Sequence, residues 1–482
     1  MGRIHKLFLF LLVISNFFAF KTFSKNDQKQ LFYEVNQIII KGNEITKSKV
    51  IIRELAFKKN QQISQNEIEK KIEISNSNLT NLNLFNFITI TYEIIEDKIN
   101  FTIDLVERWY IWPYPIFEIS ERNFNVWWND FKESDYRDFS RLNYGIFLNI
   151  ENFRGLNELL HVKFRKGFKE HYMLRYETPY INKQKTLGIN THIEFFRRKK
   201  TYYQTVFNQL IYFENIENSY TSNEFLFDFE IIYKRNLNTK HKLNLNYQNV
   251  KIDQEIAVLN PNYLLSGYSN RTTSDFYKLS YQFIKEKRNN NVYPTEGYYL
   301  NFELGKNFGL DVNHIQINSH VEKHFKLFNN LLLGSSLKSR TTNSKQQAYF
   351  SAQTLGFDDY VRGYEFYVID GEDFYLSKTA FKYAIVQNRK YDIPYMKMKQ
   401  FNKSHFSIYA TIFSDIGYAK NNTDYINNSL TNSILWGRGF SIDYVTYYDK
   451  LLRIEFSINE LGEKGVFLHF SNPFGETKKK WE

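Results

Sequence analysis

The residue types that most often carry enzyme chemistry do not stand at catalytic spacings in this chain. The Gly334-Ser335-Ser336 stretch lacks the G-x-S-x-G pattern that exposes a nucleophilic serine. The 10 histidines show no H-E-x-x-H spacing, and the sequence contains no phosphate-binding loop. With 0 cysteines, thiol catalysis and cysteine metal sites are excluded. The sequence therefore predicts a protein that is not an enzyme and has no cofactor or metal.

The composition favours a membrane barrel. Among 482 residues, 18% are aromatic, yet the mean hydropathy is only −0.50. Barrel strands alternate lipid-facing and lumen-facing residues, which keeps the mean hydropathy low while aromatics stay frequent. The net charge of +11 could indicate nucleic acid. The basic residues are spread out, however, and the dense run Lys478-Lys479-Lys480 comes only at the C-terminus, so no nucleic-acid partner is predicted.

Residues 1–24 have the layout of a secretory signal peptide. Arg3 and Lys6 precede an apolar run from Leu7 to Phe20, and polar residues resume at Lys21. This run is shorter than the roughly 20 apolar residues of a transmembrane helix. An uncleaved membrane anchor is the alternative interpretation.

Residues 31–108 show the pattern of a small α/β domain. Thr46 is placed to cap the first helix, and Ser64 with Glu67 resembles a capping box before the second. The expected elements are a strand over Val35 to Lys41, a helix from Thr46 to about Leu55, a helix to about Leu82, and strands over Ile88 to Ile95 and Ile99 to Val106.

From Trp109 onward, segments with a period of two replace the helical pattern. A clear case is Leu452, Ile454 and Phe456, which alternate with Arg453, Glu455 and Ser457. Such two-faced strands fit a soluble sandwich or a membrane barrel. The export signal and the aromatic residues near segment ends, such as Trp109, Tyr110, Trp112 and Tyr114, favour the barrel. At roughly 20–25 residues per strand and connection, residues 109–474 predict a closed transmembrane antiparallel β-barrel of about 16 strands, followed by a basic tail over 475–482.

Three sets of residues resemble one protein family. Ile38-x-Ile40-x-Gly42-Asn43 with Thr46 resembles a POTRA domain, the polypeptide-transport-associated module. Val361-Arg362-Gly363-Tyr364 matches a VRG(F/Y) signature, and Phe413-Ser414-Asp415-Ile416-Gly417 matches an F-x-D-x-G strand motif. Together they resemble the BamA/TamA superfamily of outer-membrane assembly and translocation barrels (bacterial surface antigen family), with a single POTRA domain.

This resemblance implies a loop folded back into the lumen, where Arg362 is locked to Asp415. A bidentate pair satisfies a guanidinium inside a barrel and fixes its orientation. Gly363 would allow the tight turn, and Gly417 would leave room on the wall. The family often has a second, glutamate partner for this arginine, but here the best match is Lys382. The resemblance also implies a C-terminal strand that carries Val466, Leu468, Phe470 and Phe474.

The function implied by the resemblance is outer-membrane protein assembly, insertion or translocation. The POTRA domain, in the periplasm, would accept a client strand by β-augmentation, and a weak seam would join the first barrel strand, near Phe117, to the last, near Gly465 to Phe474. The implied partners are the outer-membrane lipid bilayer, unfolded client outer-membrane or exported proteins, and periplasmic or lipoprotein accessory subunits. A dedicated secretion pore and a structural or receptor barrel are the alternatives.

Overall fold

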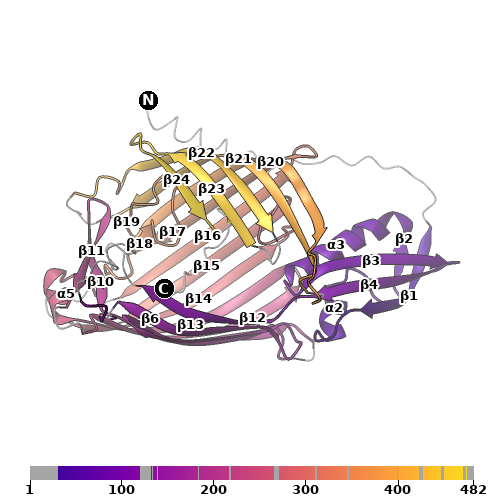
Figure 1. Cartoon of the computed structure of the whole chain (residues 1–482), viewed down its shortest axis with the longest axis horizontal. Coiled ribbons are helices and arrows are strands. Elements are labelled where there is room, and N and C mark those ends of the chain that lie inside the picture. The colour runs from indigo at the N-terminus through magenta and orange to yellow at the C-terminus, as the bar shows by residue number, and fades with distance from the viewer. Residues whose placement is uncertain are drawn as a thin grey trace.

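The computed structural model describes residues 31–119, 132, 134–137, 139, 141–182, 184–215, 219–264, 271–309, 312–344, 347–398, 400–422, 427–446, 450–470 and 474. The predicted signal peptide and the basic tail lie outside these residues. The described part forms a small N-terminal α/β domain and a large sheet that curls into a barrel (Figure 1). No described helix has the length and apolar character needed to cross a membrane.

The N-terminal domain is a four-stranded sheet covered by two helices. Its sheet order is β2-β1-β4-β3, in which β1 and β4 run parallel. The predicted order of strand, helix, helix, strand and strand is confirmed, and β2 is an addition to it. The elements are β1 (Phe32–Lys41), α2 (Ser48–Glu54), β2 (Gln62–Ser64), the 3-10 helix η1 (Gln65–Glu67), α3 (Ile68–Asn81), β3 (Phe85–Ile95) and β4 (Lys98–Glu107).

The core of this domain follows from the alternation along β4. Ile99, Phe101, Ile103 and Leu105 are buried on the face that α2 and α3 cover, where Ile51 joins them. An apolar face of this kind must be covered, which explains why the helices pack there.

Neither of the two predicted helix caps forms. Lys47 is the N-cap of α2 and makes no side-chain capping bond, and Ser64 makes none at η1. The Thr46 hydroxyl is instead 3.1 Å from the Tyr110 hydroxyl and accepts a hydrogen bond of 2.8 Å from Asn152. The expected helix cap is thus used to join the domain to the barrel.

The barrel is one sheet of 16 strands, which agrees with the predicted number. Every neighbouring pair of its strands is antiparallel. In sheet order the strands are β5 (Ile111–Ile119), β6 (Leu142–Phe153), β7 (Glu158–Gly167), β8 (Lys169–Thr178), β9 (Leu187–Arg198), β12 (Ser222–Asn236), β13 (Thr239–Ile252), β14 (Thr273–Glu286), β15 (Gly297–Gly309), β16 (Asn313–Lys326), β17 (Leu331–Thr342), β20 (Asp373–Asp392), β21 (Lys403–Lys420), β22 (Ile434–Thr446), β23 (Lys450–Ile458) and β24 (Lys464–His469).

The strands have the two faces that the sequence predicts. On β23, Ile454 is exposed on the outer face, whereas Arg453 and Glu455 are fully buried inside. The same alternation on β20 turns Lys378 and Lys382 inward and Phe381 outward. Outward apolar and inward polar side chains are the arrangement of a transmembrane barrel.

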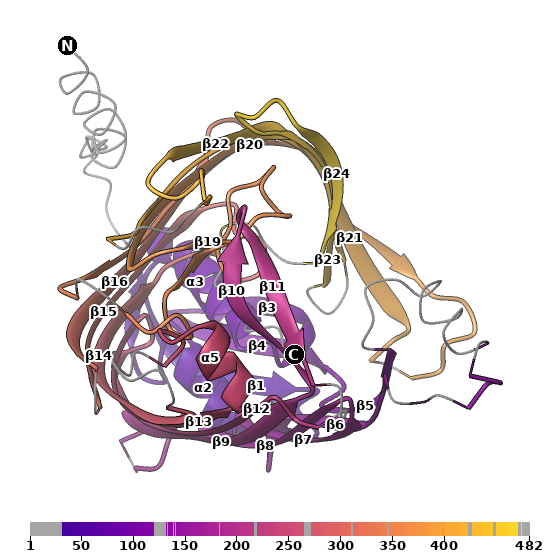
Figure 2. The same ribbon diagram turned by 90° about the vertical axis from the view of Figure 1, so that its left-hand side faces the viewer.

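The expected closed cylinder is corrected by the structure. Among the described residues, β5 pairs only with β6, and β24 pairs only with β23. Figure 2 looks into the barrel from the end opposite the N-terminal domain and shows β5 and β24 at the two margins of the curled sheet. The barrel is therefore open along a seam, in part because β24 is only 6 residues long.

The C-terminal strand also differs from the prediction. Val466, Leu468 and Phe470 do share the outer face, but β24 ends at His469, before Phe470. Phe474 is fully buried in the lumen, with its ring 5.6 Å from that of His324. The aromatic ring gains apolar burial there that the outer end of a short strand does not offer.

The N-terminal domain lies at one mouth of the barrel. The long β20–β21 hairpin reaches it, and the Asn86 amide donates to the Gln400 carbonyl over 2.9 Å (Figure 1). The Phe401 ring is 6.5 Å from that of Trp109 and 6.4 Å from that of Trp112. Tyr110, which the sequence placed in an interfacial aromatic belt, is buried in the domain because its hydroxyl donates to Leu84.

Candidate functional site

The chain between β17 and β20 carries the predicted signature into the barrel. It contains two short strands, β18 (Gln353–Leu355) and β19 (Ile369–Asp370), which pair with each other. We call residues 343–372 the lumen loop. Val361, Arg362 and Tyr364 of this loop are 1%, 0% and 2% exposed, so the signature is fully enclosed.

Arg362 and Asp415, which the resemblance pairs, form a bidentate ion pair in the structure. Arg362 Nε donates to Asp415 Oδ2 over 2.7 Å, and Nη2 donates to Oδ1 over 2.5 Å. The Arg362 backbone N–H also donates to Oδ2 over 3.3 Å. The guanidinium lies 3.7 Å from the centre of the Phe413 ring, so the F-x-D-x-G motif supplies both an anion and an aromatic face.

Glycines allow the close approach of the loop to the wall. Gly363 has φ +92°, in the left-handed region that disfavours side chains, directly after Arg362. A Cβ at Gly417 would collide with Val361. A Cβ at Gly437, the residue opposite Asp415 on β22, would collide with the carbonyl oxygen of Arg362. Gly437 had no role in the sequence analysis, although a glycine inside a strand indicates a close backbone approach.

A set of apolar residues that the sequence analysis missed holds the loop against β20, β21 and β22. Such inward apolar positions break the rule that a barrel interior is polar, and they cluster around Val361 and Tyr364. The wall contributes Phe374, Leu376, Ala419 and Leu435.

A second hairpin fastens the loop from the end opposite the N-terminal domain. It consists of β10 (Lys200–Val206) and β11 (Gln209–Glu214), and Figure 2 shows it across the barrel opening, near α5 (Gln254–Leu259). At its tip, the Asn208 carbonyl accepts from Val368 N–H over 2.8 Å, and Asn208 N–H donates to Asn428 over 2.8 Å. These bonds tie the lumen loop to the β21–β22 connection.

Lys382 does not act as a second partner for Arg362. Its ammonium lies 4.0 Å from the centre of the Tyr293 ring and 5.0 Å from that of Phe474. Within the described residues, Asp415 is the carboxylate that hydrogen-bonds Arg362, and Arg362 Nη1 is buried without a hydrogen-bond partner.

The three predicted POTRA residues lie where the N-terminal domain meets the barrel. Gly42 has φ +81°, and a Cβ there would collide with the Leu105 carbonyl. The Asn43 amide donates to the Thr46 carbonyl over 2.9 Å. Thr46 N–H donates to Glu107 over 2.6 Å, while its hydroxyl meets Asn152 of β6. This turn therefore attaches the domain to the second barrel strand.

The free margin of β5 lacks two hydrogen-bond donors. Glu151 N–H donates to the Tyr110 carbonyl, and the register with β6 is unbroken from Ile111 onward, so even-numbered residues of β5 point their amides at β6. Odd-numbered residues therefore point theirs at the open seam. Two of these are Pro113 and Pro115, which have no N–H.

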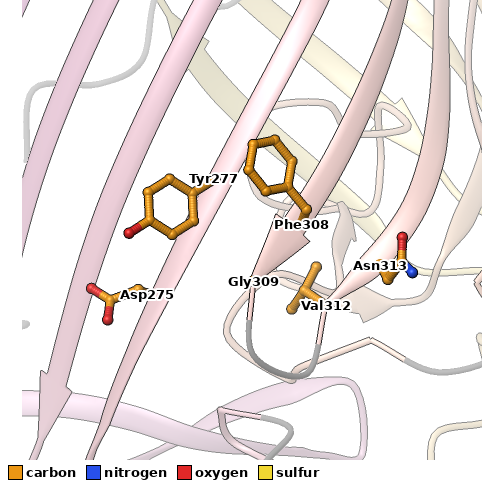
Figure 3. A pocket seen from close by; sticks show the side chains of 6 residues that line it. All are labelled: Asp275, Tyr277, Phe308, Gly309, Val312 and Asn313. Atoms are coloured by element: carbon orange, nitrogen blue, oxygen red, sulfur yellow. The ribbon is translucent and has the colours of Figure 1, made fainter.

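A hollow of about 520 Å³ lies away from this site, at the ends of β14, β15 and β16. Figure 3 shows Tyr277 and Phe308 side by side along it, with Asp275 below them. The two rings stack with centres 5.5 Å apart. Its six lining residues include none of the lumen loop.

Comparison with protein families agrees with this geometry. Residues 152–458 match the model described as Omp85 superfamily domain, and residues 33–108 match the POTRA model described as surface antigen variable number repeat. The chain belongs to the Omp85 superfamily. This bears out the resemblance to outer-membrane barrels with one POTRA domain.

Solved structures show the same fold at low sequence identity. BamA from Haemophilus ducreyi lacking POTRA domains 1–3 is 13% identical, with a TM-score of 0.50, over 91% of this chain and 83% of that one. CdiB from Escherichia coli is 11% identical, with a TM-score of 0.51, over 91% of this chain and 74% of that one. No curated protein sequence matches significantly.

Proposed function

We propose that this Omp85 barrel lies in the outer membrane, with its POTRA domain in the periplasm, and inserts or translocates client proteins through its seam. The observation that carries the proposal is that, in the part of the chain that the structure describes, β5 and β24 each leave one margin unpaired. Unpaired backbone groups in a bilayer are costly, so a margin facing lipid favours pairing with any strand that reaches it. An unfolded client outer-membrane or exported protein supplies such strands.

The chemistry of this mechanism is strand exchange without hydrolysis of a nucleotide. Pro113 and Pro115 remove donors from the β5 margin, so direct closure onto β24 forms fewer hydrogen bonds than a regular ladder. Fewer bonds must then break when a client strand enters. The Arg362–Asp415 pair holds the lumen loop against β21, so the wall of β20, β21 and β22 near the seam keeps its shape during the exchange.

The POTRA domain offers a first binding edge for the client. β3 lies at the edge of its sheet, and Tyr92, Ile94 and Ile95 are exposed there. An extended segment can add to such an edge through main-chain hydrogen bonds. Periplasmic or lipoprotein accessory subunits would also bind on this domain, because it projects from the mouth of the barrel (Figure 1).

Locking the seam tests this proposal. The chain has 0 cysteines, so a pair introduced as Phe117→Cys and Val466→Cys is the only thiol pair present. Oxidation is expected to stop insertion of a client barrel into liposomes that contain the purified protein, and reduction is expected to restore it. Each single-cysteine variant serves as the control. Full insertion with the seam locked would contradict the proposal.

The same preparation separates the alternatives. If locked protein still supports export of an unfolded substrate, and loss of the lumen loop opens a large conductance in planar bilayers, the chain is a dedicated secretion pore. A structural or receptor barrel would show neither effect.

A further inference from the structure

Three potential metal ligands converge beside the lumen loop. Glu365 follows the signature directly, Glu455 lies on β23, and His469 ends β24. One carboxylate oxygen of each glutamate and one ring nitrogen of the histidine all lie within 4.8 Å of one another. These residues are far apart in the sequence, so only the fold brings them together.

The converging atoms are buried and have no hydrogen-bond partner within the described part of the chain. They include Glu365 Oε1 and His469 Nε2, and neither oxygen of Glu455 accepts a hydrogen bond, although Oε2 forms an ion pair with Arg453. The Glu455 side chain is 0% exposed, and its Oε2 lies 3.1 Å from Arg453 Nε, which leaves Oε1 free. A buried carboxylate oxygen without a hydrogen-bond partner is costly, so a cation bound at this position would stabilise the cluster.

The distances fit a coordination polyhedron better than a hydrogen bond. His469 Nε2 and Glu365 Oε1 are 3.7 Å apart, which is too long for a hydrogen bond. With metal–ligand bonds of about 2.0–2.1 Å, two ligands of a tetrahedral Zn²⁺ stand about 3.4 Å apart.

Each candidate ligand is also oriented by a neighbour. Gly363 N–H donates to Glu365 Oε2 over 2.8 Å, which turns Oε1 toward the cluster. The Tyr360 hydroxyl is 3.2 Å from His469 Nδ1. If Nδ1 holds the proton and donates it to Tyr360, Nε2 has a free lone pair, as a metal ligand requires.

Another histidine–glutamate cluster in the lumen shows the contrast. Glu322 lies 2.9 Å from His320 Nε2 and 3.1 Å from His324 Nε2, and it also accepts from Arg288 over 2.9 Å. There the carboxylate reaches its partners directly and leaves no space for an ion between them. In the Glu365, Glu455 and His469 cluster, Glu455 contacts Arg453 directly, but His469 and Glu365 stand 3.7 Å apart.

We propose that Glu365, Glu455 and His469 bind a divalent transition metal, with Zn²⁺ the best-fitting ion and water as its fourth ligand. Zn²⁺ accepts both imidazole nitrogen and carboxylate oxygen as ligands, and the two carboxylates supply negative charge at the site, of which Glu455 shares its own with Arg453. The ion would tie the lumen loop to the last two strands of the barrel, next to the seam. This site does not depend on the proposed insertion activity.

The test uses the full-length mature protein, purified in detergent, stripped of metal and titrated with ZnCl₂. Isothermal titration is expected to give a single tight Zn²⁺ site per chain. Co²⁺ is expected to give the intense visible bands of a four-coordinate site. Glu455→Gln and His469→Gln are each expected to weaken Zn²⁺ binding by at least about tenfold. His241→Gln, which removes a β13 histidine outside the cluster, should leave binding unchanged.

Heat-modifiable gel migration establishes that each variant is folded before it is titrated. A folded wild type without a stoichiometric Zn²⁺ site, or with a site that survives both Glu455→Gln and His469→Gln, would overturn the proposal. Should a variant fail to fold, Co²⁺ spectra of Glu365→Gln give the same decision, because Glu365 lies in the loop and not in the sheet.

Discussion

Two parts of the same sheet are built in opposite ways. The wall of β20, β21 and β22 has strands of 20, 18 and 13 residues, and it holds the lumen loop through a buried ion pair and an apolar cluster. The seam has a 9-residue β5 with two prolines on its free margin, and a 6-residue β24. The wall of β20, β21 and β22 is held by many contacts, whereas β5 and β24, among the described residues, form no hydrogen bonds with each other across the seam.

Because of this difference, one part of the barrel can stay rigid while another part exchanges strand partners. A wall of long paired strands can carry the POTRA contact through the β20–β21 hairpin and the loop contact through Asp415. A margin without partners can pair with a new strand. Breaking the wall should therefore affect folding and conductance, whereas repairing the margin should affect exchange alone.

The largest effect is expected from removal of one partner of the buried ion pair. Asp415→Asn leaves the Arg362 charge without its carboxylate, and Arg362→Ala leaves that of Asp415 without its cation, each at a cost of about 3–5 kcal/mol in unfolding free energy. Chemical unfolding in detergent measures the loss, and planar bilayers should show raised conductance as the loop detaches.

The matched control for the ion pair is Arg154→Ala. Its guanidinium pairs with Glu158, but its side chain is 57% exposed, and the Glu158 carboxylate keeps hydrogen bonds from Tyr176 and Thr178, so the change should destabilise the protein much less than Arg362→Ala does. Equal destabilisation by Arg154→Ala and Arg362→Ala would contradict the expectation that the buried lumen pair contributes more to stability than an exposed one.

A smaller effect is expected from a methyl group on the wall. Gly437→Ala places a Cβ against the Arg362 carbonyl, so the loop must move or β22 must bend, at about 1–3 kcal/mol. Gly305→Ala is the control, because the one close contact of its Cβ would be with the end of the flexible Lys278 side chain. Tryptic cleavage within the lumen loop should accelerate in Gly437→Ala and stay slow in Gly305→Ala.

A change at the β5 margin should alter the stability of the open barrel least, because its new donors act only when the seam closes, yet it should clearly change activity. Pro113→Ala with Pro115→Ala restores two N–H donors to β5, each stabilising a closed seam by about 0.5–1.5 kcal/mol. Client insertion should slow by about one order of magnitude, with spin labels on β5 and β24 reporting a closer margin. Phe117→Ala changes a side chain on the same margin without adding a donor, so a similar slowing there would refute the role of the prolines.

The sequence predicted much of the fold because strand alternation is a local property. The inward Arg453 and Glu455 and the outward Ile454 could be assigned by counting in twos along β23. The same counting along β4 puts Ile99 and Phe101 on one face of the strand, and that face is the buried POTRA core. It failed where a side chain had a non-local partner: Thr46 could cap a helix by its position, but Asn152, 106 residues away, takes its hydroxyl.

The candidate site was predictable only through the resemblance. Arg362 and Asp415 are 53 residues apart, and nothing local indicates that they meet. Gly437 lies in no motif. A side chain at this position would collide with the Arg362 carbonyl oxygen, and that clash exists only because the lumen loop packs against β22. Phe474 has the parity of an outer-face residue, yet it is buried inside beside His324.

Local patterns in the sequence predict the alternation, the approximate number of strands, the α/β pattern of the POTRA domain and the two signature motifs, because each depends on neighbouring residues. The folded chain alone reveals that β5 and β24 do not pair among the described residues, that Pro113 and Pro115 face the seam, and that Glu365, Glu455 and His469 meet. Those outcomes depend on the register and curvature of the whole sheet, because these bring together residues that are far apart in the sequence.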